Sequence, residues 1–162
     1  MNKRTFISFA IGIAAIASIA QTIPNGNPHR FRATQNPIIT HKHTADPAPF
    51  VKGDTLYLYT GVDFAGNQGG YKMHEWNLYS TTDMVNWTEH PSPLHVDEFK
   101  WQNSHAAYAG HVIERNGKWY FYVSTNWCGI GVAIADNPRG PFKDALGKQL
   151  LTTANCPGTT HS

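Results

Sequence analysis

The feature that most constrains the fold is an internal repeat of short strand-forming segments. Residues 50–59 and 113–122 share one pattern, in which a strand end is followed by a glycine turn and a strand that ends on aromatic-x-Tyr. Each segment is followed by a loop, a third strand-forming run and a polar turn that leads to an aromatic residue, in residues 80–87 and 135–142. A unit of three or four strands repeating every 55 to 64 residues or so is typical of a β-propeller blade.

The rest of the pattern indicates an all-β chain. Residues 55–59 alternate as a half-buried strand does, residues 119–123 form a nearly continuous apolar run, and no convincing helical pattern follows the N-terminal region. Lys52-Gly53-Asp54 and Asn116-Gly117-Lys118 are tight-turn signals, of which Asn-Gly is the stronger. An ordinary β-sandwich with coincidental hairpins is the alternative.

Two such units raise a physical difficulty. A propeller needs at least about four blades to close its ring, and blades that lack neighbours leave apolar faces exposed. We therefore expect the sequence to be part of a larger ring, with blades one and two in residues 37–151 and a tail that matches no blade in residues 152–162. A gene product without a stable fold is a further alternative.

The N-terminus has the three features of a secretory signal peptide. Lys3 and Arg4 precede an apolar run from Phe6 to about Ile19, and small residues at the spacing of a cleavage site end the segment. We expect residues 1–20 to be removed and the mature chain to be secreted or periplasmic, with no membrane association; an uncleaved anchor is the alternative. Residues 21–36 are rich in Pro, Asn and Gly and are expected to form an extended lead-in.

Charge and cysteine content narrow the function classes. The formal net charge of +2 and the absence of a Lys/Arg cluster beyond the N-terminus argue against nucleic-acid binding. Cys128 and Cys156 are the two cysteines, which is enough for one disulfide in an exported chain but not for a cysteine zinc site.

One acid has a distinctive position. Asp46 lies just before the first strand of the first unit, and the flanking Pro47 and Pro49 lack N–H donors and stiffen the backbone. In a propeller the first strand of each blade lines the central axis, so a carboxylate at its start is placed to meet a ligand. Asp-Pro is also a common turn pair, and a purely structural turn is the alternative.

An ordered series of motifs from about Asn36 to Leu151 resembles the opening of glycoside hydrolase family 43, which includes arabinofuranosidases, xylosidases and arabinanases. Each motif is weak alone, but their order is specific. The motifs are residues 36–38, 45–47, 53–61, 80–88, 108–120 and 130–142.

This resemblance implies a five-bladed β-propeller, of which the chain holds about the first two blades, and an inverting glycosidase that hydrolyses O-glycosyl bonds in arabinose- or xylose-containing plant polysaccharide or oligosaccharide. Inversion uses two carboxyl groups about 6.5–9.5 Å apart, one activating a water and one protonating the leaving oxygen. Asp46 matches the family's general base. No cofactor is implied, and calcium at the centre of a complete ring stays open.

The family's proton donor and the acid that keeps its pKa high come from later blades, and neither motif is found in this sequence. The chain's glutamates do not sit in the donor's context; they include Glu75, Glu89, Glu98 and Glu114. We therefore expect the isolated chain to lack glycosidase activity. A non-catalytic carbohydrate-binding propeller is the alternative function.

Other residues are candidates for sugar contact. His43 is expected near Asp46 at the mouth, and Tyr108 and His111 open the second unit, where contact with sugar and plain packing are both open. Trp76 and Trp101 are candidate stacking platforms, with core or rim packing as the alternative. His41-x-His43 puts two imidazoles on one face of an extended segment, but no third ligand is fixed by spacing, so no metal site is predicted.

Overall fold

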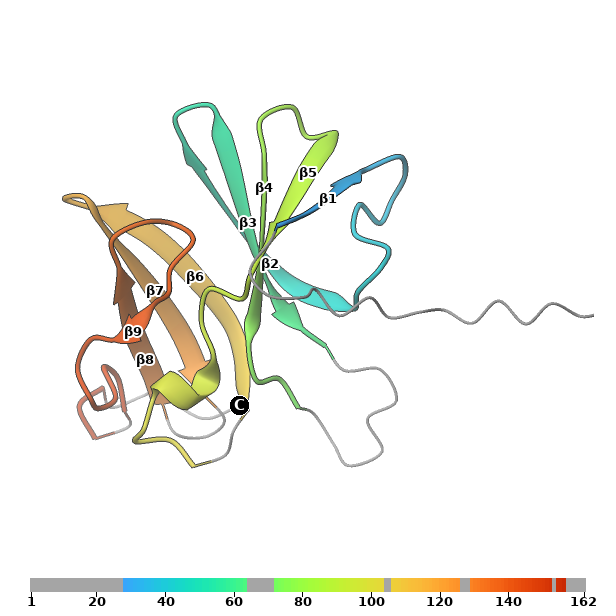
Figure 1. Ribbon diagram of the computed structural model, residues 1–162. Coiled ribbons are helices and arrows are strands. Elements are labelled where there is room, and N and C mark those ends of the chain that lie inside the picture. Colours follow the sequence, from blue (N-terminus) through green and yellow to red (C-terminus); the bar gives the residue numbers. More distant parts are fainter. Residues whose placement is uncertain (1–27, 64–71, 104–105, 126–128, 153, 157–162) are drawn as a thin grey trace, which may run out of the picture.

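The computed structural model describes residues 28–63, 72–103, 106–125, 129–152 and 154–156 and consists of two antiparallel sheets side by side (Figure 1). The first sheet has the order β1-β5-β4-β3-β2 and the second the order β6-β7-β8-β9. Within these residues the helical content is one 3₁₀ turn, η1 (Val96–Glu98), and no helix has the length and apolar character that a bilayer span needs.

From β2 to β5, and again from β6 to β9, each strand pairs with the next one along the chain. The first sheet contains β1 (His29–Arg32), β2 (Thr44–Lys52), β3 (Thr55–Val62), β4 (Trp76–Thr81) and β5 (Asn86–His90). The second contains β6 (Ala107–Arg115), β7 (Lys118–Thr125), β8 (Gly129–Ala135) and β9 (Lys143–Asp144). The first strands of the two meanders, β2 and β6, contact each other (Figure 1). Each meander therefore begins with the strand nearest the other sheet. This is the strand arrangement of two neighbouring propeller blades, as the repeat predicted.

The turns that separate the strands follow the sequence signals. The second hairpin closes by pairing Arg115 with Lys118, and Asn116 and Gly117 both have positive φ, of 53° and 75°. Two successive positive φ angles are the requirement of the hairpin turn that Asn-Gly favours, because its twist matches that of the strands. The corresponding first hairpin pairs Lys52 with Thr55, with Gly53 at φ 61°.

The polar turn between β4 and β5 is held by side-chain hydrogen bonds. The hydroxyl of Thr81 accepts bonds from the backbone N–H groups of Asp83 and Met84, at 3.2 and 2.9 Å. The Asp83 carboxylate in turn accepts bonds from the backbone N–H groups of Val85 and Asn86, at 2.9 and 2.7 Å. These bonds satisfy backbone donors at a turn, which is why Thr and Asp suit these positions.

The main core fills the space between the two sheets. Phe121 of β7 is fully buried, and its ring centroid lies 5.3 Å from that of Tyr59 and 5.4 Å from those of Trp76 and Phe142. Tyr59 and Trp76 belong to the first sheet, so these aromatic contacts fix one blade against the other. The next residue, Tyr122, points to the opposite face of its sheet and is 37% exposed.

A second cluster covers the face of the first sheet that points away from the second sheet. Its buried members are Ile39, Leu58, Tyr79 and Trp87. Phe31 of β1 packs on it, with ring centroids 6.0 Å from Tyr79 and 6.4 Å from Trp87. Part of the expected lead-in therefore forms a fifth strand, so the first blade is wider than the repeat indicated.

Several expectations fall on residues outside those described. They include the signal peptide at residues 1–20, the start of the lead-in, Cys128 and therefore its pairing with Cys156, and most of the tail at residues 152–162. These expectations stay predictions.

Candidate active site

Asp46 lies on a β-bulge of the innermost strand. Ala45 pairs with Gly61 and Ala48 pairs with Tyr59. Two residues of β2, Asp46 and Pro47, therefore lie opposite a single residue of β3. A bulge of this kind breaks the alternation of the strand and changes the direction of its side chains. Asp46 is exposed, so its carboxylate is accessible to water and to a ligand.

The same irregularity occurs in the second blade. Ala107 pairs with Thr125 and Gly110 with Val123, so Tyr108 and Ala109 form a two-residue bulge on β6. The indole N–H of Trp76 donates a hydrogen bond of 3.3 Å to the carbonyl oxygen of Tyr108, which ties the bulge to the first blade. Both inner strands thus carry a bulge at the same end, where sequence reasoning expected the mouth of the ring.

The backbone of Asp46 is in the left-handed region, with φ of 52°. Residues other than glycine adopt this conformation at a cost, which Asp tolerates better than most. The following residue is a proline, whose ring further restricts the residue before it. Such strain gathers at functional positions, where a side chain must point in a direction that a regular strand does not allow.

The other predicted mouth residues lie on these same strands or just before them. His43 precedes β2 and is exposed, with its carbonyl oxygen accepting a bond of 3.1 Å from the Asp63 N–H. His111 of β6 is exposed and Tyr108 is half-buried. The structure therefore leaves His43 and His111 accessible at the inner strands with Asp46.

The two candidate stacking tryptophans lie in different surroundings. Trp76 is 1% exposed and packs inside the core between the sheets, so neither face of its ring is open to a ligand. Trp101 is half-buried; its indole N–H donates a bond of 3.0 Å to the carboxylate of Asp144, and its ring lies against Phe99. For Trp76 the packing alternative describes the structure, because the interior between the blades needs large apolar side chains.

The strongest polar network was missed by sequence reasoning. Glu89 of β5 is 1% exposed; its carboxylate forms an ion pair with Lys42 and lies within hydrogen-bonding distance of the His29 and His41 imidazoles. Lys42 also donates a hydrogen bond of 3.4 Å to the side chain of Asn77, which bonds in turn to Thr60 opposite the Asp46 bulge. This chain of contacts fixes the segment that leads into Asp46.

Two of the glutamates, Glu89 and Glu114, are poor candidates for the proton donor. A general acid needs a raised pKa. Burial acts to raise the pKa of Glu89, but hydrogen bonds and charge from Lys42 and His41 outweigh it and leave the pKa lowered. The pKa of Glu114 is lowered by hydrogen bonds from the Lys52 ammonium and the Gly117 N–H. These two carboxyl groups therefore favour the ionised form and are unsuited to donate a proton at neutral pH.

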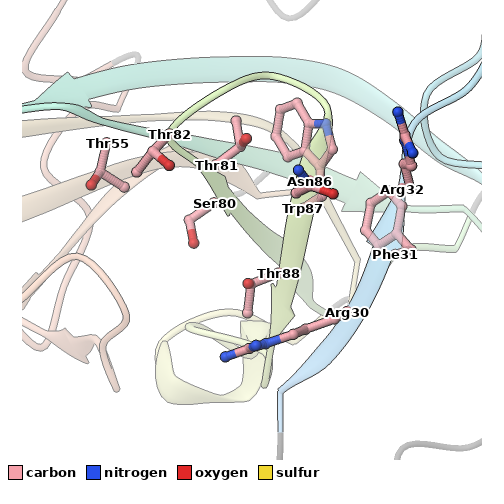
Figure 2. A pocket seen from close by; sticks show the side chains of 10 residues that line it. All are labelled: Arg30, Phe31, Arg32, Thr55, Ser80, Thr81, Thr82, Asn86, Trp87 and Thr88. Carbon is pink, nitrogen blue, oxygen red and sulfur yellow. The ribbon is translucent and has the colours of Figure 1, made fainter.

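A shallow hollow lies elsewhere, on the outer strands of the first sheet (Figure 2). Its volume is about 680 Å³, and Asp46 is not among its lining residues. The lining comes from β1, β3, β4, β5 and the turn between β4 and β5, and half of its residues carry a hydroxyl group: Arg30, Phe31, Arg32, Thr55, Ser80, Thr81, Thr82, Asn86, Trp87 and Thr88. The hollow is therefore separate from the candidate active site.

Taken together, the two meanders, their contacting inner strands and the exposed acid on a bulge define two blades of a propeller with a polar mouth. The model of the glycosyl hydrolases family 43 matches residues 34–156. This chain belongs to that family, as its motifs indicated.

Known relatives support the assignment. An arabinoxylan arabinofuranohydrolase of Paenibacillus polymyxa is 31% identical over 166 residues, which are 91% of this chain and 26% of that protein. A solved α-L-arabinofuranosidase of Clostridium thermocellum superposes with a TM-score of 0.60 at 34% identity, covering 72% of this chain and 39% of the other. A β-xylosidase/α-arabinofuranosidase from a compost metagenome, solved with xylotriose in a calcium-free form, gives a TM-score of 0.60 at 26% identity and covers 73% and 38%. The chain thus spans well under half the length of these relatives.

Proposed function

We propose that the protein to which these blades belong is an inverting glycoside hydrolase and that Asp46 is its general base. The observation that carries the proposal is the exposed Asp46 carboxylate on a bulge of the innermost strand, in a chain of this family. An exposed carboxylate has direct access to the water from which a general base takes its proton.

The chemistry follows from that position. The Asp46 carboxylate removes a proton from a water while the water oxygen forms a bond to the anomeric carbon. The bond from that carbon to the leaving oxygen breaks on the opposite face, and a carboxylic acid gives its proton to the leaving oxygen. We propose that this acid comes from another part of the ring, because the family's motif for the proton donor is not found in this sequence.

The substrate class we propose is an arabinose- or xylose-containing plant polysaccharide or oligosaccharide. The support is the similarity to an arabinoxylan arabinofuranohydrolase and to an enzyme solved with xylotriose. His43, Tyr108 and His111 are the proposed sugar contacts on this chain, because they lie on or beside the two inner strands and are exposed or half-buried. Export is proposed from the N-terminal residues alone.

Calcium at the centre of a complete ring stays an open part of the proposal, as one solved neighbour is described in a calcium-free form. Ca²⁺ takes six to eight oxygen ligands. Among the described residues, the one group of three or more His, Cys, Asp or Glu side chains with converging ligand atoms contains two imidazoles and lies at the outer strands. This group of His and Glu side chains is therefore not an oxygen-rich calcium site.

The test joins residues 28–156, which include β1, to the part of the Paenibacillus polymyxa relative that follows its matching region. We expect this hybrid to release sugar from aryl arabinofuranosides or xylosides, and the chain alone to release none, because a pocket needs the remaining blades. A folded hybrid that binds xylo-oligosaccharide without turnover would favour the carbohydrate-binding alternative. Turnover by the isolated chain near ordinary enzyme rates would contradict the proposal.

A further inference from the structure

Three side chains from separate segments converge at the outer edge of the first sheet. His29 lies on β1, His41 lies in the segment before β2, and Glu89 lies on β5. The Glu89 Oε2 atom is 3.3 Å from His29 Nδ1 and 2.8 Å from His41 Nε2, and the three atoms all lie within 4.8 Å of one another. We propose that His29, His41 and Glu89 bind one zinc ion, which fastens β1 and the segment before β2 to the first blade.

The strand register creates this arrangement. His29 pairs directly with Glu89 across β1 and β5, so the two side chains share one face of the sheet. Phe31, two residues further along β1, contacts the ring of His41 edge to face at 5.0 Å. That contact orients the His41 imidazole toward Glu89. The backbone and an aromatic neighbour thus place the ligand atoms before any metal binds.

Burial and access both suit a bound ion. The Glu89 side chain is 1% exposed, whereas those of His29 and His41 are 39% and 32% exposed. A buried carboxylate supplies the negative charge that a divalent cation needs, away from competing water. The two half-open imidazoles leave a path for the ion and a free position for water.

Lys42 occupies the other oxygen of the same carboxylate. Its ammonium contacts Glu89 Oε1, while both imidazoles meet Oε2. Metal-binding carboxylates are usually held by such a second contact, which orients them and leaves one oxygen for the metal. Lys42 is therefore a positioning residue.

The ligand set favours zinc over calcium or magnesium. Two histidines and one carboxylate, with a position left for water, are a known zinc set, whereas calcium and magnesium prefer oxygen. Bonds of about 2.0–2.1 Å in a tetrahedral site place ligand atoms roughly 3.4 Å apart. The 3.3 Å between His29 Nδ1 and Glu89 Oε2 matches this spacing. The 2.8 Å between His41 Nε2 and Glu89 Oε2 would have to widen by about half an ångström.

The site differs from the pair that sequence spacing suggested. His41-x-His43 offered two imidazoles and no third ligand, but His43 is absent from the cluster. His29 takes its place, from a strand that lies before the residues matched by the family model. Sequence spacing cannot show this, because His29 and Glu89 are 60 residues apart.

The experiment uses the full chain without an affinity tag, treated with a chelator and titrated with Zn²⁺ in equilibrium dialysis. We expect one zinc ion per chain and a rise of roughly 5–10 °C in the unfolding midpoint at about 100 times the Kd. His29→Ala and His41→Ala should each weaken binding by about 100-fold or more. Both side chains are partly exposed, so these variants should fold.

His43→Ala is the matched control, since it removes an exposed imidazole two residues from His41, and it should bind Zn²⁺ as the parent does. Co²⁺ in place of Zn²⁺ should give visible absorption that His29→Ala and His41→Ala abolish. Ca²⁺ should give no shift. Absence of Zn²⁺ binding by the parent chain, or equal loss in His43→Ala and His41→Ala, would overturn the proposal.

Discussion

Removal of the Phe121 ring tests whether the aromatic core between the blades holds them together. Phe121 is fully buried, and rings of Tyr59, Trp76 and Phe142 lie within 5.4 Å of its own. A buried Phe→Ala change costs about 3–5 kcal/mol. We expect the upper part of that range, because aromatic pairs add about 0.5–1.5 kcal/mol each beyond the area they bury.

Urea unfolding, followed by tryptophan fluorescence, measures this loss. With a slope of about 2 kcal/mol per molar urea, Phe121→Ala should lower the midpoint by about 2 M. Tyr122→Ala is the matched control, because the next residue of the same strand points to the opposite face and is 37% exposed. It should cost about 1 kcal/mol or less. Equal losses in the two variants would refute the idea that the core lies between the sheets.

Three further predictions follow from single positions. Asp83→Asn should destabilise the chain at pH 7, because hydrogen bonds from the backbone and side chain of Asn86 lower the pKa of Asp83. The stability that the Asp83 carboxylate contributes is present above its unfolded pKa near 4 and is lost as the pH falls. A parent–variant difference in urea midpoint that stays constant down to pH 2 would contradict this. Asp46→Gly should be up to about 1 kcal/mol more stable than Asp46→Ala in urea unfolding, because glycine adopts the φ of 52° without strain; a more stable Ala variant would count against the bulge geometry. Gly131→Ala should cost about 1–3 kcal/mol in thermal or urea unfolding, because a Cβ there would lie 2.8 Å from a ring carbon of Phe99, and an unchanged midpoint would show that the ring can move.

The strands and turns that depend on local sequence pattern could be predicted from the sequence. Alternating and aromatic runs with an Asn-Gly turn located β3, β7 and the hairpin at Asn116, because strand periodicity and turn chemistry act over a few residues. The repeat then predicted two similar meanders, and the family motifs added Asp46. These features need no knowledge of which distant residues meet.

Features that depend on pairing between residues far apart in the chain could not be predicted from the sequence. The four residues of β1 are too few to give a strand signal, and pairing with β5 is what makes them a strand. Glu89 reads as an ordinary surface glutamate, yet it is buried because segments 48 and 60 residues away bring His41 and His29 to it. Trp76 has the character of a sugar platform in sequence, and its burial depends on where the second sheet packs. Long-range packing decided each of these outcomes.

In the proposed mechanism Asp46 activates the attacking water, and the rate of the active hybrid with and without that carboxylate measures this role most directly. Asp46→Asn keeps the size of the side chain and removes its basicity. We expect kcat to fall by a factor of about 10²–10⁴ and the affinity for oligosaccharide to stay within a few fold of the parent value. A hybrid that hydrolyses its substrate equally fast with Asn at this position would contradict this mechanism.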